Sequence, residues 1–324
     1  MLKPLRGSGL RRRAANLTTA IIPNLITLGN AVCGFVALTL ISRVEVDLDN
    51  LRKAAWCIIL GMLFDVFDGR VARMTGTTSN FGAQLDSFSD LVTFGLAPAG
   101  LMLTLHDTLV VRGGPWHQIV WVFGLAYFLG AMLRLARFNT EHDESESAHL
   151  CFKGMPTPGA AGCIAGLVLV YFWLHKWESW ELRELAVVRP EWVEVAKVWI
   201  ARVLPFAAFL AGYAMVSNRL FYPHFASVLV NRRHSFDTFV YMVFGLMVAF
   251  LMIEPFLCVA FVGYMLWTPI STLYRVVIRR QGWMPAELIA SSGADELHEE
   301  TETDADDRES TSSKSAPPSA GPGI

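Results

Sequence analysis

Four aspartates stand in one short segment whose flanks are almost wholly apolar. The segment, residues 65–90, reads DVFDGRVARMTGTTSNFGAQLDSFSD. Asp65 and Asp68 are three residues apart, so they share one face of a helix. Asp86 and Asp90 are four residues apart and share a face of the next helix. Because the Gly, Thr, Ser and Asn residues between the pairs predict a turn, a helical hairpin would bring the carboxylates together.

The energy of burying these carboxylates indicates what must accompany them. Each carboxylate at the middle of a membrane helix costs about 2.5–3.5 kcal/mol to insert, so four cost about 10 kcal/mol. Arg70 and Arg73 could pair with two of the aspartates, but two arginines cannot neutralise four carboxylates. Hard oxygen ligands suit Mg²⁺ or Mn²⁺, and a pair of such ions about 4 Å apart is common in phosphoryl transfer. We therefore expect a divalent metal site with two ions.

The apolar residues form blocks of the length that crosses a membrane. Hydrophobic residues make up 53% of the 324-residue chain and charged residues 17%, against about 25% charged in a typical soluble domain. A helix of about 20 residues spans a hydrocarbon core about 30 Å thick. We predict an all-α integral membrane protein with about eight spans: 19–43, 54–74, 84–106, 117–138, 157–175, 195–217, 236–253 and 255–275. Glu254 and Pro255 would form a tight turn between the last two.

Positive charge predicts the orientation of these spans. Lysine and arginine gather at the N-terminus, after the sixth span and after the eighth, which favours cytoplasmic termini and places the acidic pairs near the cytoplasmic end of spans 2 and 3. We expect a protein of the bacterial cell (inner) membrane, in contact with membrane lipids and without a nucleic-acid partner. Its predicted parts are a basic juxtamembrane segment at 1–18, a transmembrane catalytic domain at 19–278 and an acidic, disordered cytoplasmic tail at 279–324.

The spacing of the acidic segment resembles the signature of the CDP-alcohol phosphotransferase family. Eight residues stand at the fixed positions of that signature: Asp65, Asp68, Gly69, Ala72, Arg73, Gly82, Asp86 and Asp90. The resemblance implies transfer of a phosphatidyl or related group from a CDP-linked donor to an alcohol, with release of CMP. It implies that Asp65, Asp68 and Asp86 hold the metal pair. Asp90 would contribute to the second ion and act as general base on the alcohol.

The same resemblance implies which residues contact the donor. Gly69 would let the cytidine diphosphate approach the backbone closely, as only glycine allows, and Arg73 would contact the diphosphate. The remaining donor-binding candidates are Ala72, Gly82, Ser79 in the turn, and Asn24 and Thr27 near the cytidine.

Four further stretches are similar to the bacterial and archaeal phosphatidylserine synthases of the membrane-embedded type: PNLITLGNAVCG at 23–34, RLARFN at 134–139, FKGMPTP at 152–158 and MVSNRLFYPHF at 215–225. This similarity implies CDP-diacylglycerol as donor and L-serine as acceptor. Arg134 and Arg137 could bind the serine carboxylate with bidentate guanidinium groups. Lys153 would join them, although the same cations could bind lipid phosphate or follow the positive-inside rule. Asn139 could bind the serine amine or cap a helix end.

Two alternative functions remain open at this point. A sister enzyme would use another acceptor, such as glycerol phosphate, inositol phosphate or choline. A cation transporter would use the aspartates as an ion path, but would leave the spacing of Gly69, Ala72 and Gly82 unexplained. The family resemblance also implies a homodimer formed by the late helices.

Overall fold

The computed structural model describes residues 7–43, 47–75, 80–109, 115–141, 151–179, 190–223, 244–245, 247 and 249–278. Within these ranges the chain is helical apart from two strands of three residues each and short turns. The chain divides into two compact units, Met1–Thr272 and Leu273–Ile324. The described part of the second unit contains a π-helix, η3 (Tyr274–Ile278), and the candidate site lies wholly in the first.

The first unit is built of long helices that follow the predicted spans closely. They are α1 (Gly7–Ile41), α2 (Leu48–Thr75), α3 (Asn80–Asp90), the π-helix η1 (Leu91–Leu96), α4 (Ala97–Leu109), α5 (Pro115–Glu141), α6 (Thr157–Ser179), α7 (Pro190–Val216) and α10 (Ile253–Leu273). The chain is therefore an all-α integral membrane protein, as predicted.

The number of apolar spans differs from the prediction of about eight. Among the described residues, six stretches are long and apolar enough to cross a membrane: Ile21–Ile41, Asn80–Leu109, Pro115–Thr140, Thr157–Lys176, Trp192–Val216 and Ile253–Leu273. The helix α2 is not among them, although its 28 residues reach about 42 Å at 1.5 Å per residue, because charged residues interrupt its apolar run. The predicted span 236–253 lies mostly outside the described residues.

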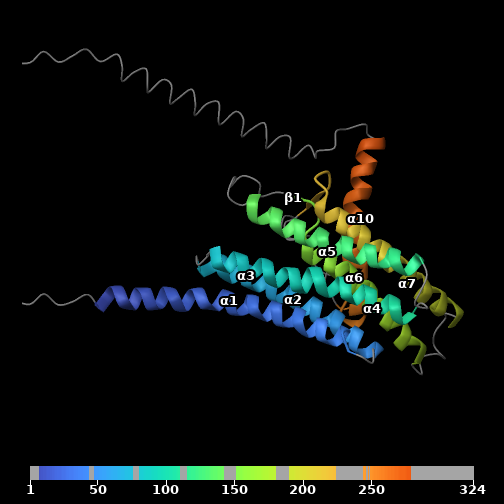
Figure 1. The fold of residues 1–324 in the computed structure, drawn as a ribbon, viewed down its shortest axis with the longest axis horizontal. Helices are drawn as coiled ribbons and strands as arrows, with labels where there is room; N and C mark the ends of the chain where they lie inside the picture. Colours follow the sequence, from blue (N-terminus) through green and yellow to red (C-terminus); the bar gives the residue numbers. More distant parts are fainter. Residues whose placement is uncertain are drawn as a thin grey trace, which may run out of the picture. The chain divides into compact units, whose positions relative to one another are not determined.

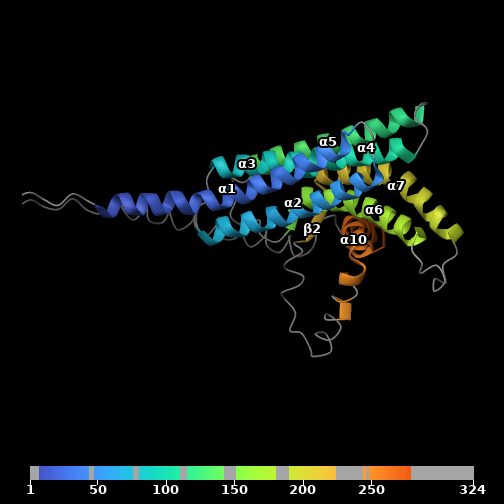
Figure 2. The same cartoon turned by 90° about the horizontal axis from the view of Figure 1, so that it is seen from below.

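The helices α2 and α3 carry the acidic segment, and each of them packs along α1 (Figures 1 and 2). Buried residues of α1 recur at helical spacing, as expected for a packed face: Pro23, Thr27, Asn30, Gly34, Ala37 and Ile41. Glycines allow a close approach where η1 meets this face. A Cβ on Gly34 would lie 2.9 Å from the Cα of Thr93, and one on Gly61 would lie 2.6 Å from Thr93 Cγ2. Thr93 therefore fits between α1 and α2 only because both positions lack a side chain.

A second set of close contacts holds α5 against α7 and η1. A Cβ on Gly130 of α5 would lie 2.7 Å from the carbonyl oxygen of Gly212 in α7. The Tyr127 hydroxyl of α5 donates a hydrogen bond of 2.7 Å to the Phe94 carbonyl oxygen in η1. The wide π turn leaves a carbonyl available to this side chain, so α5 is fixed to the helix that follows the acidic segment.

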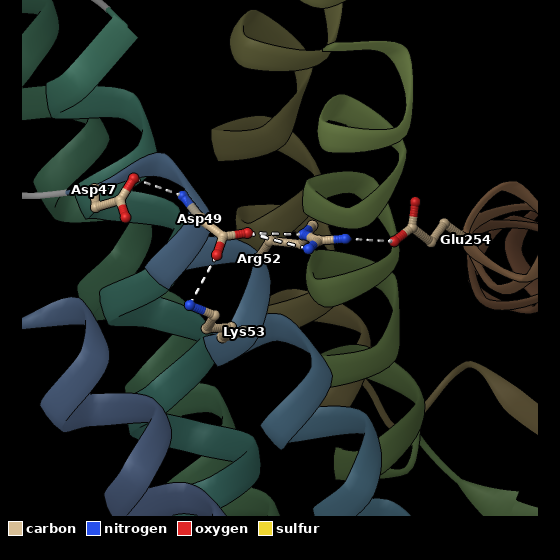
Figure 3. A network of polar contacts seen from close by, with 5 residues as sticks. All are labelled: Asp47, Asp49, Arg52, Lys53 and Glu254. Atoms are coloured by element: carbon tan, nitrogen blue, oxygen red, sulfur yellow. Dashed lines mark hydrogen bonds and ion pairs between the residues drawn. The ribbon is translucent and has the colours of Figure 1, made fainter. Parts of the chain in front are cut away.

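Charged residues tie the start of α2 to the start of α10 (Figure 3). Asp49 forms ion pairs with Lys53 at 2.8 Å and with Arg52 at 3.1 Å, and Arg52 lies 3.9 Å from Glu254. Hydrogen bonding from Lys53, and then from Arg52, lowers the pKa of the Asp49 carboxyl from its ordinary value. The helix α10 already begins at Ile253, so the predicted turn at Glu254 and Pro255 falls slightly earlier, and Pro255 occupies a first helical turn, where it is tolerated.

Candidate active site

The hairpin of α2 and α3 brings three of the four aspartates together. Carboxylate oxygens of Asp65, Asp68 and Asp86 all lie within 4.8 Å of one another. Asp68 is only 4% exposed, and buried oxygens of Asp68 (Oδ2) and Asp86 (Oδ1) have no hydrogen-bond partner within the described part of the chain. Such orphaned, converging carboxylate oxygens fit a hard divalent cation.

The alternative in which arginines neutralise the cluster does not occur. Arg70 and Arg73 have exposed side chains, and in the described ranges neither forms an ion pair with the aspartates. In the described part of the chain, neither arginine offsets the charge of the three converging carboxylates, and such like charges repel one another. The donor set of the cluster therefore matches a metal site better than a salt-bridge network.

Asp90 stands one helical turn beyond Asp86 and is bound differently from the other three. It is 7% exposed, and its Oδ1 accepts a hydrogen bond of 2.9 Å from Asn30 Nδ2 of α1. The charges of Asp65 and Asp86 act on it, so it belongs to the same electrostatic cluster. Asp90 is also the last residue of α3, and the π-helix η1 begins directly after it.

The donor-binding candidates that the structure describes lie on α1, on α2 and at the start of α3. A Cβ placed on Gly69 would meet nothing within 4 Å, so the backbone there faces open space one residue after Asp68. Thr27 is buried, donates its hydroxyl to the Pro23 carbonyl oxygen at 3.1 Å and lies against Asp68. The others are half-buried (Asn24, Ala72, Gly82), exposed (Arg73) or outside the described residues (Ser79).

Polar side chains of α3 and α5 form a second cluster next to the first. Ser87, adjacent to Asp86, donates a hydrogen bond of 3.0 Å to Asn139 Oδ1. Arg137 donates from Nη1 to the Oδ1 of Asn218, which follows α7. The alternative in which Asn139 caps the end of α5 is wrong, because α5 continues to Glu141. The side-chain oxygen of Asn139 instead accepts the hydrogen bond from Ser87 of α3.

The remaining acceptor candidates lie on α5 and β1. Arg134, one turn before Arg137, is 7% exposed. Lys153 ends the strand β1 (Cys151–Lys153), which pairs antiparallel with β2 (Phe221–Pro223), and only its backbone is described. Gly154 follows with a φ of 83° and donates a backbone hydrogen bond of 2.8 Å to the Leu220 carbonyl oxygen. Residues 151–155 are thus attached to the segment that carries Asn218.

Three polar residues of these clusters were not predicted as site residues. Asn30 could have been identified from the sequence, because an amide at a core-facing position of an apolar helix needs a hydrogen-bond partner. Ser87 and Asn218 carried no such signal, since isolated Ser and Asn residues near helix ends are common.

Comparisons with known proteins point to one family. Residues 20–201 match the model of a family described as CDP-alcohol phosphatidyltransferase. The chain is 38% identical over 150 residues to a CDP-diacylglycerol–serine O-phosphatidyltransferase of Bacillus subtilis, a match that covers 46% of this chain and 76% of the relative. Proteins of the same name from Helicobacter pylori (29% over 211 residues; 65% and 75% covered) and Methanocaldococcus jannaschii (33% over 145 residues; 45% and 59% covered) are also similar to it.

Proposed function

Because the chain belongs to the CDP-alcohol phosphatidyltransferase family, we propose that it transfers the phosphatidyl group of CDP-diacylglycerol to L-serine and releases CMP. The convergence of Asp65, Asp68 and Asp86 at the hairpin of α2 and α3 is the observation that carries this proposal. The names of the relatives in Bacillus, Helicobacter and Methanocaldococcus support serine as the acceptor. The chain is thus a membrane-bound transferase.

The acidic residues would hold the divalent metal on which this family in general depends. Asp65, Asp68 and Asp86 would bind a pair of Mg²⁺ or Mn²⁺ ions, with Asp90 contributing to the second. When bound, such ions neutralise the diphosphate and stabilise the charge that develops on the leaving CMP. Orphaned oxygens on Asp68 and Asp86 support this assignment.

The protein side chains would perform the remaining steps. Asp90 takes the proton of the serine hydroxyl, because an alcohol is a poor nucleophile until a base removes its proton. The serine oxygen then bonds to the β-phosphorus of CDP-diacylglycerol. The bond between that phosphorus and the bridging oxygen breaks, and CMP leaves with the electron pair. The open backbone at Gly69 would accommodate the diphosphate, and Arg73 would contact it. Asn24, Thr27, Ala72, Ser79 and Gly82 would line the rest of the donor site.

The second polar cluster would bind the acceptor. Arg137 is held by Asn218, so its guanidinium is oriented for a carboxylate with which it can form two hydrogen bonds. Arg134 and Lys153 would add positive charge, and Asn139, on the same end of α5, would contact the serine amine. Because Ser87 links this cluster to the residue next to Asp86, a bound serine would lie near the general base.

The placement of the site suggests how substrates reach it. We assign the protein to the bacterial inner membrane with both termini cytoplasmic, because arginines and lysines gather at the N-terminus, after α7 and after α10. Acyl chains would remain among membrane lipids while serine arrives from the cytoplasm.

The proposed parts of the chain are the basic segment 1–18, the catalytic domain 19–278 and the acidic tail 279–324. Two chains would associate as a homodimer.

The reaction is tested by CMP release from purified protein in detergent. The assay contains CDP-diacylglycerol with Mn²⁺ or Mg²⁺, and serine is present or absent. Release that requires L-serine and stops in EDTA is expected. Release with only glycerol phosphate, inositol phosphate or choline would keep the family reaction and overturn the serine site. No release with any alcohol from folded protein, together with metal flux into vesicles, would indicate a cation transporter instead.

The acceptor pocket is tested by the variant Arg137→Lys. Lysine keeps the positive charge but cannot form the bidentate pair with a carboxylate. We expect the KM for serine to rise about tenfold, the effect of losing roughly 1.4 kcal/mol of binding, while the KM for CDP-diacylglycerol stays within about twofold. A rise in the KM for CDP-diacylglycerol with an unchanged KM for serine would instead assign Arg137 to the lipid phosphate.

A further inference from the structure

The amide of Asn30 lies in the interior and contacts the proposed general base. Asn30 is 0% exposed, so it touches neither water nor a soluble substrate. Its Nδ2 donates a hydrogen bond of 2.9 Å to Asp90 Oδ1 across 60 residues of sequence. The side-chain amide of Asn30 therefore contacts the proposed site through Asp90 rather than by touching a substrate.

The surroundings of Asn30 hold its amide in one orientation. The backbone carbonyl of Asn30 accepts a hydrogen bond of 2.9 Å from the Thr93 hydroxyl, one turn beyond Asp90. A Cβ on Gly61 would lie only 2.9 Å from Asn30 Oδ1, so α2 closes the space beside the amide. Rotation of the amide by a half turn would place its oxygen against the Asp90 carboxylate and is disfavoured by repulsion.

Asn30 is poorly suited to a role in packing alone. Its Oδ1 is buried and has no hydrogen-bond partner in the described part of the chain, and an unsatisfied buried carbonyl oxygen destabilises a fold. An apolar side chain of the same shape would fill the site without this penalty. The bond to Asp90 is the interaction that offsets it.

We propose that Asn30 is a positioning residue that holds the carboxylate of Asp90 by its Oδ1 and leaves Oδ2 directed to the reacting groups. This inference rests on the role of Asp90 in the proposed function. The π-helix η1, which starts directly after Asp90 and inserts Thr93 between Gly34 and Gly61, keeps the two partners in register. Such π turns are frequent at functional sites.

The kinetic test compares two substitutions of similar shape, one at Asn30 and one at its hydrogen-bond partner Thr93 in η1. Asn30→Leu deletes the amide with little change in shape, and Thr93→Val deletes the hydroxyl bond to the Asn30 carbonyl without touching Asp90. Outer partners of this kind typically account for about 10–100-fold in activity. We expect Asn30→Leu to lower kcat by that factor with both KM values within about twofold, and Thr93→Val to keep kcat. A kcat of Asn30→Leu within about threefold of wild type would overturn the proposal.

A second readout, the thermal midpoint Tm in EDTA, does not depend on activity. In the wild-type background, Asn30→Leu leaves a buried carboxylate without its donor, so Tm is expected to fall by several degrees. In an Asp90→Ala background no carboxylate remains, and the same substitution is expected to leave Tm unchanged or raise it. An equal loss of Tm in both backgrounds would assign Asn30 to packing and overturn the proposal.

Two further outcomes also bear on the proposal. If Asn30→Leu does not fold, the smaller Asn30→Ser replaces it. Folding of these variants only in the Asp90→Ala background would support the proposal, and folding in neither background would overturn it. If the wild type releases no CMP with any alcohol, the proposed function fails, while the Tm comparison still decides whether Asn30 acts through Asp90.

Discussion

The open space at Gly69 makes one substitution informative about both the fold and the donor site. Gly69 lies inside α2, six residues before its end, and a Cβ there would meet nothing within 4 Å. Alanine is favoured over glycine in a helix interior by about 0.8–1.0 kcal/mol. Gly69→Ala should therefore stabilise the protein by up to about 1 kcal/mol, which raises Tm by about 2–4 °C.

The same methyl group should impair catalysis. It projects about 1.5 Å from Cα into the space that the cytidine diphosphate would occupy beside Asp68. A displacement of about 1 Å from the reactive geometry costs about 10²-fold in rate. We therefore expect kcat/KM for CDP-diacylglycerol to fall about 10²-fold while Tm rises. The two effects have opposite signs, so a loss of activity could not be attributed to unfolding.

Two glycines provide the controls for this experiment. A Cβ on Gly263 of α10 likewise meets nothing within 4 Å, so Gly263→Ala should raise Tm similarly and leave kcat/KM unchanged. A Cβ on Gly34 would lie 2.9 Å from the Thr93 Cα, and Gly34→Ala should lower Tm because overpacking against backbone costs about 1–3 kcal/mol. Tm is measured by tryptophan fluorescence, and kcat/KM is measured by CMP release. Wild-type kcat/KM in Gly69→Ala would refute the close approach of the diphosphate, and a lowered Tm would refute the open space.

Three further perturbations separate catalysis, metal binding and scaffold. Asp90→Asn should lower kcat by about 10²–10⁴-fold, the usual contribution of a general base, with a native Tm, and normal activity would refute that role. Mn²⁺ at about 100 times its Kd should raise the free energy of unfolding of wild type by about 2.7 kcal/mol, seen as a higher Tm than in EDTA; an equal rise in Asp68→Asn would place the ion elsewhere. Glu254→Gln removes the ion pair between Glu254 and Arg52, whose charged atoms are 3.9 Å apart. Because Arg52 is about 20 Å from Asp65 along α2, we expect an unchanged kcat and a stability change below about 1 kcal/mol. A large loss of kcat in that variant would show that the ends of the bundle are coupled.

Local spacing was sufficient for the central prediction of the acidic hairpin. Residues three or four apart share a helix face whatever surrounds the helix, so the pairs Asp65–Asp68 and Asp86–Asp90 could be recognised without a structure. The length of apolar blocks likewise determined the all-α membrane architecture, because a helix must satisfy its own backbone in lipid. The charged residues of α2 show the limit of that argument, since hydropathy alone does not identify this helix among the spans.

Only the tertiary structure decided which distant residues meet. Asn30 and Asp90 are 60 residues apart, Ser87 and Asn139 are 52 apart, and Arg137 and Asn218 are 81 apart. Each contact depends on the rotation and register of two helices, which are determined by close approaches such as those at Gly34, Gly61 and Gly130. The sequence by itself therefore determined the class of chemistry and the helices that carry it. The packing of those helices decided that Asp90 is held by Asn30 and that Asn139 bonds to α3 rather than capping α5, because side-chain partners across helices are a property of the assembled bundle.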